Sequence, residues 1–234
     1  MSKTDKKLSL LEHIEELRVV TIKSVLFAIV TSCIAYTFSD TILLYLVKPV
    51  GKLVFIAPQE AFLAKVTIAF FTGILFASPF IIYQIWRFVS SGLKYKEKNL
   101  AVIFGPVSFL FFLGGAAFGY FIIVPIGIRF LLGFATYYLT PMITVSKYIS
   151  FVGTLTLAFG IIFELPLAIL FLTKLGIVTP QFLSYKRKYA IVLIFIVAAI
   201  LTPPDIVTQC LLAVPLLALY ELGILFSRFA YRKG

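Results

Sequence analysis

The side chains of this sequence that are best suited to chemistry are a few carboxylates, which lie in or beside long apolar runs. Only 10 of the 234 residues are Asp or Glu, whereas 61% are hydrophobic. Glu164 follows Phe163 and precedes Leu165-Pro166 inside one such run. A carboxylate at the centre of a bilayer is costly, by about 2.5–3.5 kcal/mol on insertion scales, so Glu164 is a functional candidate by default. The alternative is a protonated or hydrogen-bonded structural Glu that a neighbouring helix holds.

A second group of carboxylates, Glu12, Glu15 and Glu16, precedes the first apolar run. Ser9-Leu10-Leu11-Glu12 has the S-x-x-E form of a capping box, in which both side chains pair with free amide groups. The helix that follows places these carboxylates opposite an apolar side. The apolar side consists of Leu10, Leu11, Ile14 and Leu17. The pattern predicts an amphipathic helix lying on the membrane, and its plain interpretation is a solvated face with a cap.

Three further carboxylates have simple interpretations from their neighbours alone. Glu97 stands in the basic run Lys94–Lys98, which is typical of a solvated loop. Asp205 follows Pro203-Pro204 and either caps the last apolar segment or has a functional role. Glu221 lies near the end of that segment, which predicts an interfacial position.

Enzyme signatures are missing from the sequence. The single histidine, His13, excludes an HExxH zinc site, and neither GxxxxGK[ST] nor GxGxxG occurs. A lone histidine near a helix start is more often a surface residue than a ligand. Cys33 and Cys210 lie far apart in apolar stretches, which indicates small core or lipid-facing residues. We therefore expect neither an enzyme nor a metal site, and no cofactor.

Composition indicates which solvent surrounds the chain. Only 13% of the residues are charged and the mean hydropathy is +1.07, so the chain cannot build a polar exterior. The apolar runs are continuous rather than alternating, which predicts membrane-spanning helices and not a barrel. We expect an all-α membrane protein with six spans in a single domain. The predicted spans are residues 19–38, 66–88, 101–128, 150–173, 189–201 and 206–226.

Local features of these segments predict how they pack. Gly115-x-x-x-Gly119 suits a close approach of helices, and Pro215 predicts a kink. The fifth segment reaches only about 20 Å at the helical rise, so the hairpin at residues 202–205 should stop short of the far membrane face. The loops at residues 40–64 and 129–149 are rich in apolar residues. We expect them to fold into short interfacial helices.

The basic residues predict the orientation. The net charge of +11 would suggest nucleic-acid binding in a soluble protein, but here the cations cluster between apolar runs. Sixteen Lys and Arg residues fall on the side of both termini and five on the other side, counted from the 21 in the chain. This asymmetry predicts cytoplasmic termini, and it argues against a nucleic-acid partner.

Several motifs, in order along the chain, resemble the TatC family, the largest subunit of the twin-arginine protein translocase. The segment from Glu12 to Arg18 resembles the family's His-Leu-x-Glu-Leu-Arg-x-Arg start, with Glu16 and Arg18 on its Glu and first Arg. Glu97 falls on the acidic residue of the first cytoplasmic loop. Two departures are Val20, in place of the second Arg, and Ser91, in place of a loop proline. The other matching segments are residues 79–88, 163–166, 202–205 with Gln209, 220–221 and 227–229.

The resemblance implies a curved, wall-like six-helix receptor in a bacterial, archaeal or organellar inner membrane. Its ligands would be twin-arginine signal peptides of folded cargo proteins, exported with the proton-motive force. Its partners would be TatA- and TatB-type single-span subunits and further copies of itself. The implied signal-peptide-binding residues are Glu16, Glu97, Arg18 and Phe88. Residues with an implied structural or functional role are Pro49, Pro79, Gln84 and Asp205, beside Glu164.

A proton-coupled secondary transporter or a channel is the main alternative, with Glu164 as the ion site. Such proteins often contain internal repeats with matching broken helices. The two halves of this sequence show no clear similarity, and charges within the spans are sparse. A passive membrane scaffold would leave Glu164 without a role.

Overall fold

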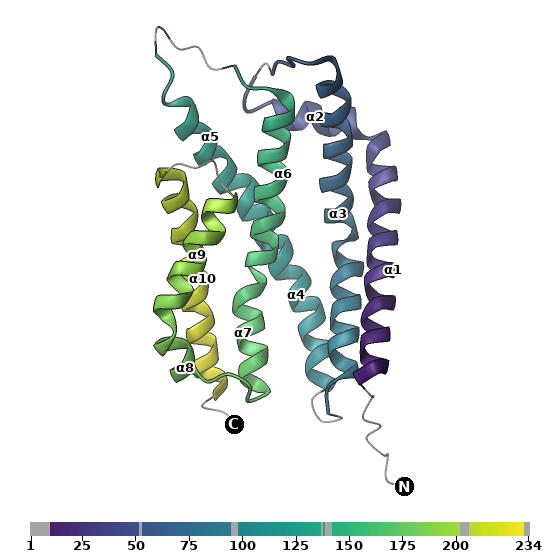
Figure 1. Ribbon diagram of the computed structural model, residues 1–234, viewed down its shortest axis with the longest axis vertical. Helices are drawn as coiled ribbons and strands as arrows, with labels where there is room; N and C mark the ends of the chain where they lie inside the picture. Colours follow the sequence, from purple (N-terminus) through teal and green to yellow (C-terminus); the bar gives the residue numbers. More distant parts are fainter. Residues whose placement is uncertain are drawn as a thin grey trace. The chain divides into compact units, whose positions relative to one another are not determined.

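The computed structural model describes residues 10–51, 53–94, 98–136, 138, 142–201 and 206–231, and most of them are helical (Figure 1). The first elements are α1 (Leu10–Thr37), α2 (Ser39–Val47), α3 (Pro58–Ser91), α4 (Lys98–Phe118) and the π-helical turn η1 (Gly119–Ile123). The remaining elements are α5 (Val124–Leu132), α6 (Val145–Ile162), α7 (Glu164–Lys174), α8 (Pro180–Tyr185), α9 (Arg187–Leu201) and α10 (Ile206–Tyr231). Within the described ranges there is no β-strand, and the predicted all-α class is confirmed.

Five helical stretches of the described chain are long and apolar enough to cross a bilayer. They are Leu11–Thr37, Pro58–Ser91, Lys98–Leu132, Val145–Lys174 and Ile206–Tyr231. One more apolar helix, α9, corresponds to the predicted fifth span. It has 15 residues and a length of about 22 Å at 1.5 Å per residue, which is less than the hydrocarbon core of about 30 Å. The prediction of a short fifth segment is therefore confirmed. The hairpin at residues 202–205, including Asp205, lies outside the described residues.

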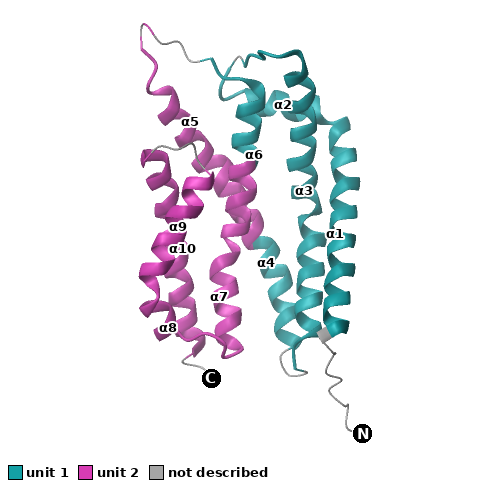
Figure 2. Ribbon diagram, viewed as in Figure 1, with its two compact units in different colours: residues 1–110, 142–153 teal, residues 111–141, 154–234 magenta. Residues whose placement is uncertain are grey.

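The chain divides into two compact units (Figure 2). Unit 1 comprises residues 1–110 and 142–153, and unit 2 comprises residues 111–141 and 154–234. The prediction of one membrane domain is not tested by this division.

Unit 1 is built on the packing of α1 against α3, which lie side by side (Figure 1). The helices approach closely where Gly73 faces Ser32, because a Cβ atom at Gly73 would collide with the Ser32 backbone. Thr31 Oγ1 lies 2.9 Å from the Gly73 carbonyl oxygen and adds a polar contact across the same interface. Small side chains at a helix contact let two backbones come together, which is the usual device of helix pairs in lipid.

The predictions for the two larger loops had different outcomes. A short helix in the first loop is confirmed by α2, which the Lys65–Asp40 ion pair (2.7 Å) joins to α3. In the second loop, residues 129–132 end α5 and residues 145–149 begin α6. The described residues between them, 133–136, 138 and 142–144, contain no helix, so a separate short helix is not found in the described part of this loop. Val54 instead donates to the Ile143 carbonyl (3.1 Å) and accepts from the Val145 amide (2.9 Å). These bonds satisfy backbone groups that a helix would otherwise have paired.

Unit 2 confirms the predicted close approach at Gly115 and Gly119. A Cβ atom at Gly115 would collide with the Phe159 carbonyl oxygen of α6, and one at Gly119 would lie 3.0 Å from the Leu155 carbonyl oxygen. The π-helical turn Gly119–Ile123 lies just before Pro125. Because proline has no N–H, one hydrogen bond of the regular α-helix cannot form there.

Prolines also shape the other spans of unit 2. The fourth span is interrupted at Phe163, where α6 ends and α7 begins, because Pro166 has no N–H for the Ile162 carbonyl. By contrast, α10 continues through Pro215, so the predicted kink does not divide that helix. Gln209 of α10 donates to the Phe195 carbonyl of α9 (3.0 Å) and ties the short helix to its neighbour.

Candidate functional site

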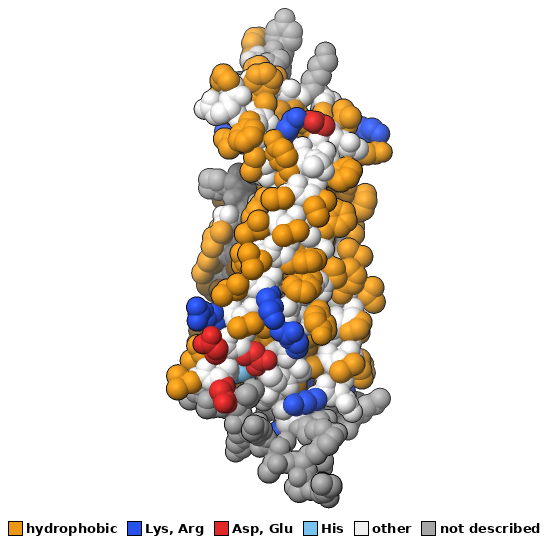
Figure 3. Space-filling view, turned by 90° about the vertical axis from the view of Figure 1, so that its right-hand side faces the viewer, with side chains coloured by type: hydrophobic (Ala, Val, Ile, Leu, Met, Phe, Trp, Pro, Cys, Tyr) orange, Lys and Arg blue, Asp and Glu red, His pale blue; other side chains and the backbone are white. Residues whose placement is uncertain are grey.

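The first candidate site lies at the N-terminal end of α1. This helix runs from Leu10 to Thr37 without interruption, so the prediction of a separate helix lying on the membrane is wrong. The segment with the three glutamates forms the first turns of the spanning helix itself. Figure 3 shows the side of the molecule on which α1 lies. Acidic side chains and the histidine gather toward its lower end, and a wide band of hydrophobic side chains covers its middle.

The face of α1 that packs in unit 1 is not the apolar one. Leu11 and Ile14 are 79% and 63% exposed, whereas Val20 is buried and His13 and Glu16 are half-buried. The inward face therefore carries His13, Glu16 and Val20 at spacings of three and four residues. A helix surrounded by lipid can leave its apolar side outward and turn its polar side chains toward protein, the reverse of the arrangement in water.

Glu16 is held by the end of α3. Ser91 Oγ lies 2.5 Å from Glu16 Oε2, within hydrogen-bond distance, and the side chain of Glu16 is 29% exposed. His13 Nδ1 lies 3.8 Å from the same carboxylate oxygen. The His13 ring stacks on Phe88 with a centroid distance of 4.3 Å and an interplanar angle of 13°. Glu16, His13, Phe88 and Ser91 therefore form one cluster, which we call the Glu16 cluster.

The structure separates the other predicted binding residues from this cluster or leaves them undescribed. Arg18 pairs with Glu15 at 3.4 Å, and both side chains are about two-thirds exposed. Arg18 therefore lies on the outer face of α1 and not beside Glu16. Glu97 lies outside the described residues.

His13 and Ser91 are members of the Glu16 cluster that the sequence did not indicate. The sequence suggested a surface position for His13, and it marked Ser91 only as a departure from the family pattern. The spacing of His13, Glu16 and Val20 could have indicated a common helix face. The hydrogen bond to Ser91, 75 residues away, has no local signal.

The remaining predicted residues of unit 1 occupy different environments. Gln84 is 2% exposed on α3, and its Oε1 has no hydrogen-bond partner among the described residues. Pro79 is an exposed residue inside α3, and Pro49 lies in the turn after α2 that Gly51 closes with a positive φ of 83°. These positions are compatible with structural roles for both prolines.

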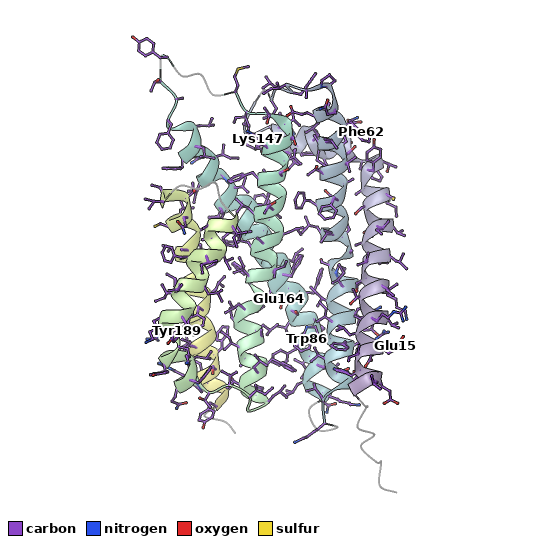
Figure 4. All side chains as sticks on the ribbon, in the orientation of Figure 1. Glu15, Phe62, Trp86, Lys147, Glu164 and Tyr189 are labelled. Atoms are coloured by element: carbon purple, nitrogen blue, oxygen red, sulfur yellow. The ribbon has the colours of Figure 1, made fainter. Side chains whose placement is uncertain are left out.

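Glu164 is the first residue of α7, directly after the interruption at Phe163 (Figure 4). It lies within the apolar stretch Val145–Lys174, as the sequence predicted, and its Oε1 atom is buried. The adjacent Phe163 ring lies 5.4 Å from the Phe118 ring, so the interruption is placed where α4 packs against the fourth span. The carboxylate is thus carried by the residue that directly follows the interruption between α6 and α7.

Other features of the described residues concern metals and surface charges. No group of three His, Cys, Asp or Glu side chains in the described ranges could hold a metal ion. Glu221 accepts a hydrogen bond from Arg187 at 2.8 Å, and both side chains are about half exposed. Cys33 and Cys210 are exposed and reduced, which agrees with lipid-facing positions.

Apolar helices of spanning length, with a carboxylate at a break inside one of them, define a polytopic helical membrane protein. The chain belongs to the TatC family, because the model of that family, described as Sec-independent protein translocase protein (TatC), matches residues 12–215. It is therefore a component of a protein translocase, which disfavours the transporter and channel alternatives.

Relatives match over nearly the whole chain. The Sec-independent protein translocase protein TatC of Carboxydothermus hydrogenoformans is 45% identical over 98% of this chain and 96% of its own length. The TatC of Aquifex aeolicus is 40% identical over 96% of both chains. A crystal structure of the twin-arginine translocase receptor TatC superposes with a TM-score of 0.87 at 39% identity. That match covers 94% of this chain and 99% of the solved one.

Proposed function

We propose that this chain is the receptor subunit that binds twin-arginine signal peptides through the Glu16 cluster. The observation that carries the proposal is the half-buried carboxylate of Glu16, which Ser91 contacts at 2.5 Å and which lies 3.8 Å from His13, the residue whose ring stacks on Phe88. The similar crystal structure is that of a twin-arginine translocase receptor, which supports the same ligand class. Glu97 is proposed as the second carboxylate, and Arg18 as a nearby cation that repels stray basic peptides.

The chemistry of the arginine pair favours carboxylates. Each guanidinium is a planar fork of N–H donors that matches a carboxylate in a bidentate way, which the ammonium group of lysine cannot reproduce. A hydrogen bond to a charged group contributes about 1.5–3 kcal/mol, so losing one contact weakens binding roughly ten- to a hundredfold. The His13 ring covers one face of Phe88. The other face is the one on which we propose that a guanidinium stacks, because such cations bind to aromatic faces.

The proposal includes an orientation and partners. The excess of Lys and Arg on the side of the termini supports a cytoplasmic Glu16 cluster, where signal peptides of folded cargo arrive. Small single-span subunits of the TatA and TatB type and further copies of this chain are the proposed partners. Export driven by the proton-motive force across an inner membrane is the proposed process.

Glu164 is proposed to act in transport rather than in peptide recognition. Its support is its place at the break between α6 and α7 within an apolar stretch, where a carboxylate is otherwise disfavoured.

The test is peptide binding by fluorescence anisotropy in mild detergent at fixed ionic strength. Glu16→Ala and Glu97→Ala should each weaken binding of a twin-arginine peptide about ten- to a hundredfold. Glu15→Ala is the matched control, because it removes a neighbouring carboxylate whose ion pair with Arg18 is exposed. We expect a change of less than about threefold in that variant, since exposed pairs contribute little.

A twin-lysine peptide distinguishes bidentate recognition from simple attraction of charge. It should bind the unmutated chain weakly and respond little to Glu16→Ala. Equal loss of affinity in Glu15→Ala and Glu16→Ala would show that only the general negative charge of α1 matters. Unchanged binding in both the Glu16 and the Glu97 variants would place the peptide site elsewhere.

A further inference from the structure

A pocket of about 640 Å³ lies between α8 and the last two turns of α10, within unit 2. Its polar lining consists of Arg228, Gln181 and Ser184, and the rest of the lining is Pro180, Leu225, Phe229 and Tyr231. The pocket therefore offers a guanidinium from α10 together with an amide and a hydroxyl group from α8, and the rest of its lining offers apolar and aromatic side chains. The pocket lies outside both the Glu16 cluster and the Glu164 region.

The walls of the pocket are held in place by hydrogen bonds of their own. Thr179 caps α8 by accepting from the Phe182 amide (3.2 Å). Tyr220 of α10 donates its hydroxyl proton to the Leu183 carbonyl of α8 (3.0 Å). Ser227, next to Arg228, is fully buried and shares a hydrogen bond of 2.8 Å with Thr173 of α7. These contacts join α7, α8 and α10 and give the pocket a preformed shape.

The charge of the pocket favours an anion. In the described part of the chain Arg228 forms no ion pair with a carboxylate, whereas the nearby Arg187 is neutralised by Glu221 at 2.8 Å. Lys186 adds positive charge directly after α8, where its Nζ lies 5.0 Å from the centre of the Tyr189 ring. A guanidinium with hydroxyl and amide donors nearby is a usual combination for binding a phosphate.

The depth of the pocket favours an anion that carries hydrocarbon chains. The 26 residues of α10 extend about 39 Å, which exceeds a hydrocarbon core of about 30 Å, so part of the helix extends to the level of the lipid headgroups. Arg228 in the last turn assigns that part to the C-terminal end, because arginine is disfavoured inside the hydrocarbon. Leu225 precedes Arg228 by about one turn on the membrane side and is 44% exposed. Phe229, 64% exposed, and the nearby Tyr185 and Tyr189 form an aromatic rim of the kind found at membrane interfaces.

We propose that this pocket binds the phosphate headgroup of an anionic phospholipid of the cytoplasmic leaflet, with an acyl chain along Leu225. A free phosphate ion would use only the polar wall, and the apolar walls would then stay exposed to water. Basic pockets beside spanning helices on the cytoplasmic side are known to suit such headgroups. The site is independent of the peptide site proposed above, because it shares none of its residues.

The test uses the full chain, purified in mild detergent and stripped of lipid, with bound lipid counted by native mass spectrometry. Phosphatidylglycerol should bind as one tight equivalent, and phosphatidylcholine, which has no net charge, should bind at least about tenfold more weakly. Arg228→Gln should weaken the phosphatidylglycerol equivalent about tenfold or more. The matched control is Arg129→Gln, which removes the same charge from an exposed arginine at the end of α5 and should leave binding unchanged.

Two further variants keep the test decisive if Arg228→Gln loses its fold. Arg228→Lys retains the charge but not the fork, and Ser184→Ala removes one donor, so both should weaken phosphatidylglycerol binding by a smaller factor. Unchanged binding in these variants and in any folded Arg228→Gln sample would overturn the proposal. Inorganic phosphate tests the other source of the anion. If it displaces the lipid at millimolar concentration, the site recognises phosphate alone and the lipid assignment is wrong.

Discussion

Neighbouring residues of one type have different roles on α1 because their surroundings differ. Glu15 and Glu16 are adjacent carboxylates, yet Glu15 pairs with Arg18 on the exposed face and Glu16 lies against the end of α3. An exposed ion pair is screened by water and salt and contributes about 0–1 kcal/mol. Among the described residues, Glu16 contacts the Ser91 hydroxyl and His13 but no lysine or arginine, so no permanent cation competes with an arginine ligand for its carboxylate. This difference makes Glu16 the better candidate for binding arginine.

Ser91→Ala tests whether the hydroxyl group positions Glu16. We expect twin-arginine peptide binding to weaken about two- to tenfold, the loss of one ordinary hydrogen bond. Besides contacting Glu16, the Ser91 hydroxyl lies 2.7 Å from the Phe88 carbonyl oxygen. Ser90→Ala is the matched control, since the Ser90 hydroxyl makes the equivalent backbone bond to the Arg87 carbonyl at 2.7 Å. Binding is measured by anisotropy as above. Equal effects of the two serine substitutions would assign Ser91 to helix termination alone.

Two substitutions of Glu164 test whether its carboxylate acts in transport. Glu164→Gln should preserve the helix content and lower export of a twin-arginine reporter protein, because the amide can form hydrogen bonds but cannot ionise. Glu164→Leu should lower export at least as much, since it removes the polar group as well. Circular dichroism in detergent controls for folding. Export at the normal rate in both variants would make Glu164 a structural residue.

Glycine allows the close contact between α4 and α6 in unit 2. Gly114 and Gly115 are neighbours on α4, and only Gly115 faces α6, where a Cβ atom would meet the Phe159 carbonyl and the Phe163 side chain. Nothing lies within 4 Å of a Cβ atom built on Gly114. We therefore expect replacement of glycine by alanine to affect stability differently at these two consecutive positions.

Gly115→Ala should lower the unfolding temperature in detergent, because overpacking a close contact destabilises by about 1–3 kcal/mol. Gly114→Ala should leave it unchanged or raise it, since alanine is favoured over glycine inside a helix by about 0.5–1 kcal/mol. Both midpoints are followed by circular dichroism under identical detergent conditions. Equal shifts in the two variants would mean that the α4–α6 contact does not limit stability.

At the scale of the whole molecule, the distribution of cations sets the expected orientation in the membrane. Positively charged flanks stay on the cytoplasmic side during insertion, and sixteen of the 21 Lys and Arg residues lie on the side predicted to be cytoplasmic. The same side would hold the Glu16 cluster and the phospholipid pocket proposed for Arg228. Both proposals therefore depend on one topology.

Cysteine labelling tests this topology. Cys33 and Cys210 are first replaced by alanine, and single cysteines are then introduced at chosen positions. Cysteine at Ile56, which is 80% exposed between α2 and α3, should react in intact cells with an impermeant thiol reagent. Cysteine at Lys174, which is exposed at the end of α7, should react only after the cells are permeabilised. The opposite labelling pattern would invert the orientation and separate the Glu16 cluster from cytoplasmic peptides.

The helical class, the short fifth segment and the glycine contacts could all be predicted from the amino-acid sequence. In a bilayer each backbone polar group must be paired within the segment, so a continuous apolar run has few alternatives to a helix. Helix length then follows from the run, as in α9, and close contacts follow from small residues such as Gly115 and Gly119. Recognition of the family came from motifs distributed along the chain, and not from composition.

Three features could not be predicted and became known from the structure: the buried face of α1, the contact between Ser91 and Glu16, and the pairing of Val54 with the backbone of the second loop. The apolar pattern of a helix in water identifies its buried face, but lipid is also apolar, and the exposed Leu11 and Ile14 therefore gave a misleading signal. Contacts between distant segments depend on which helices pack together and at what depth. That arrangement joins residues 75 positions apart, as at Ser91 and Glu16, and no local periodicity encodes it.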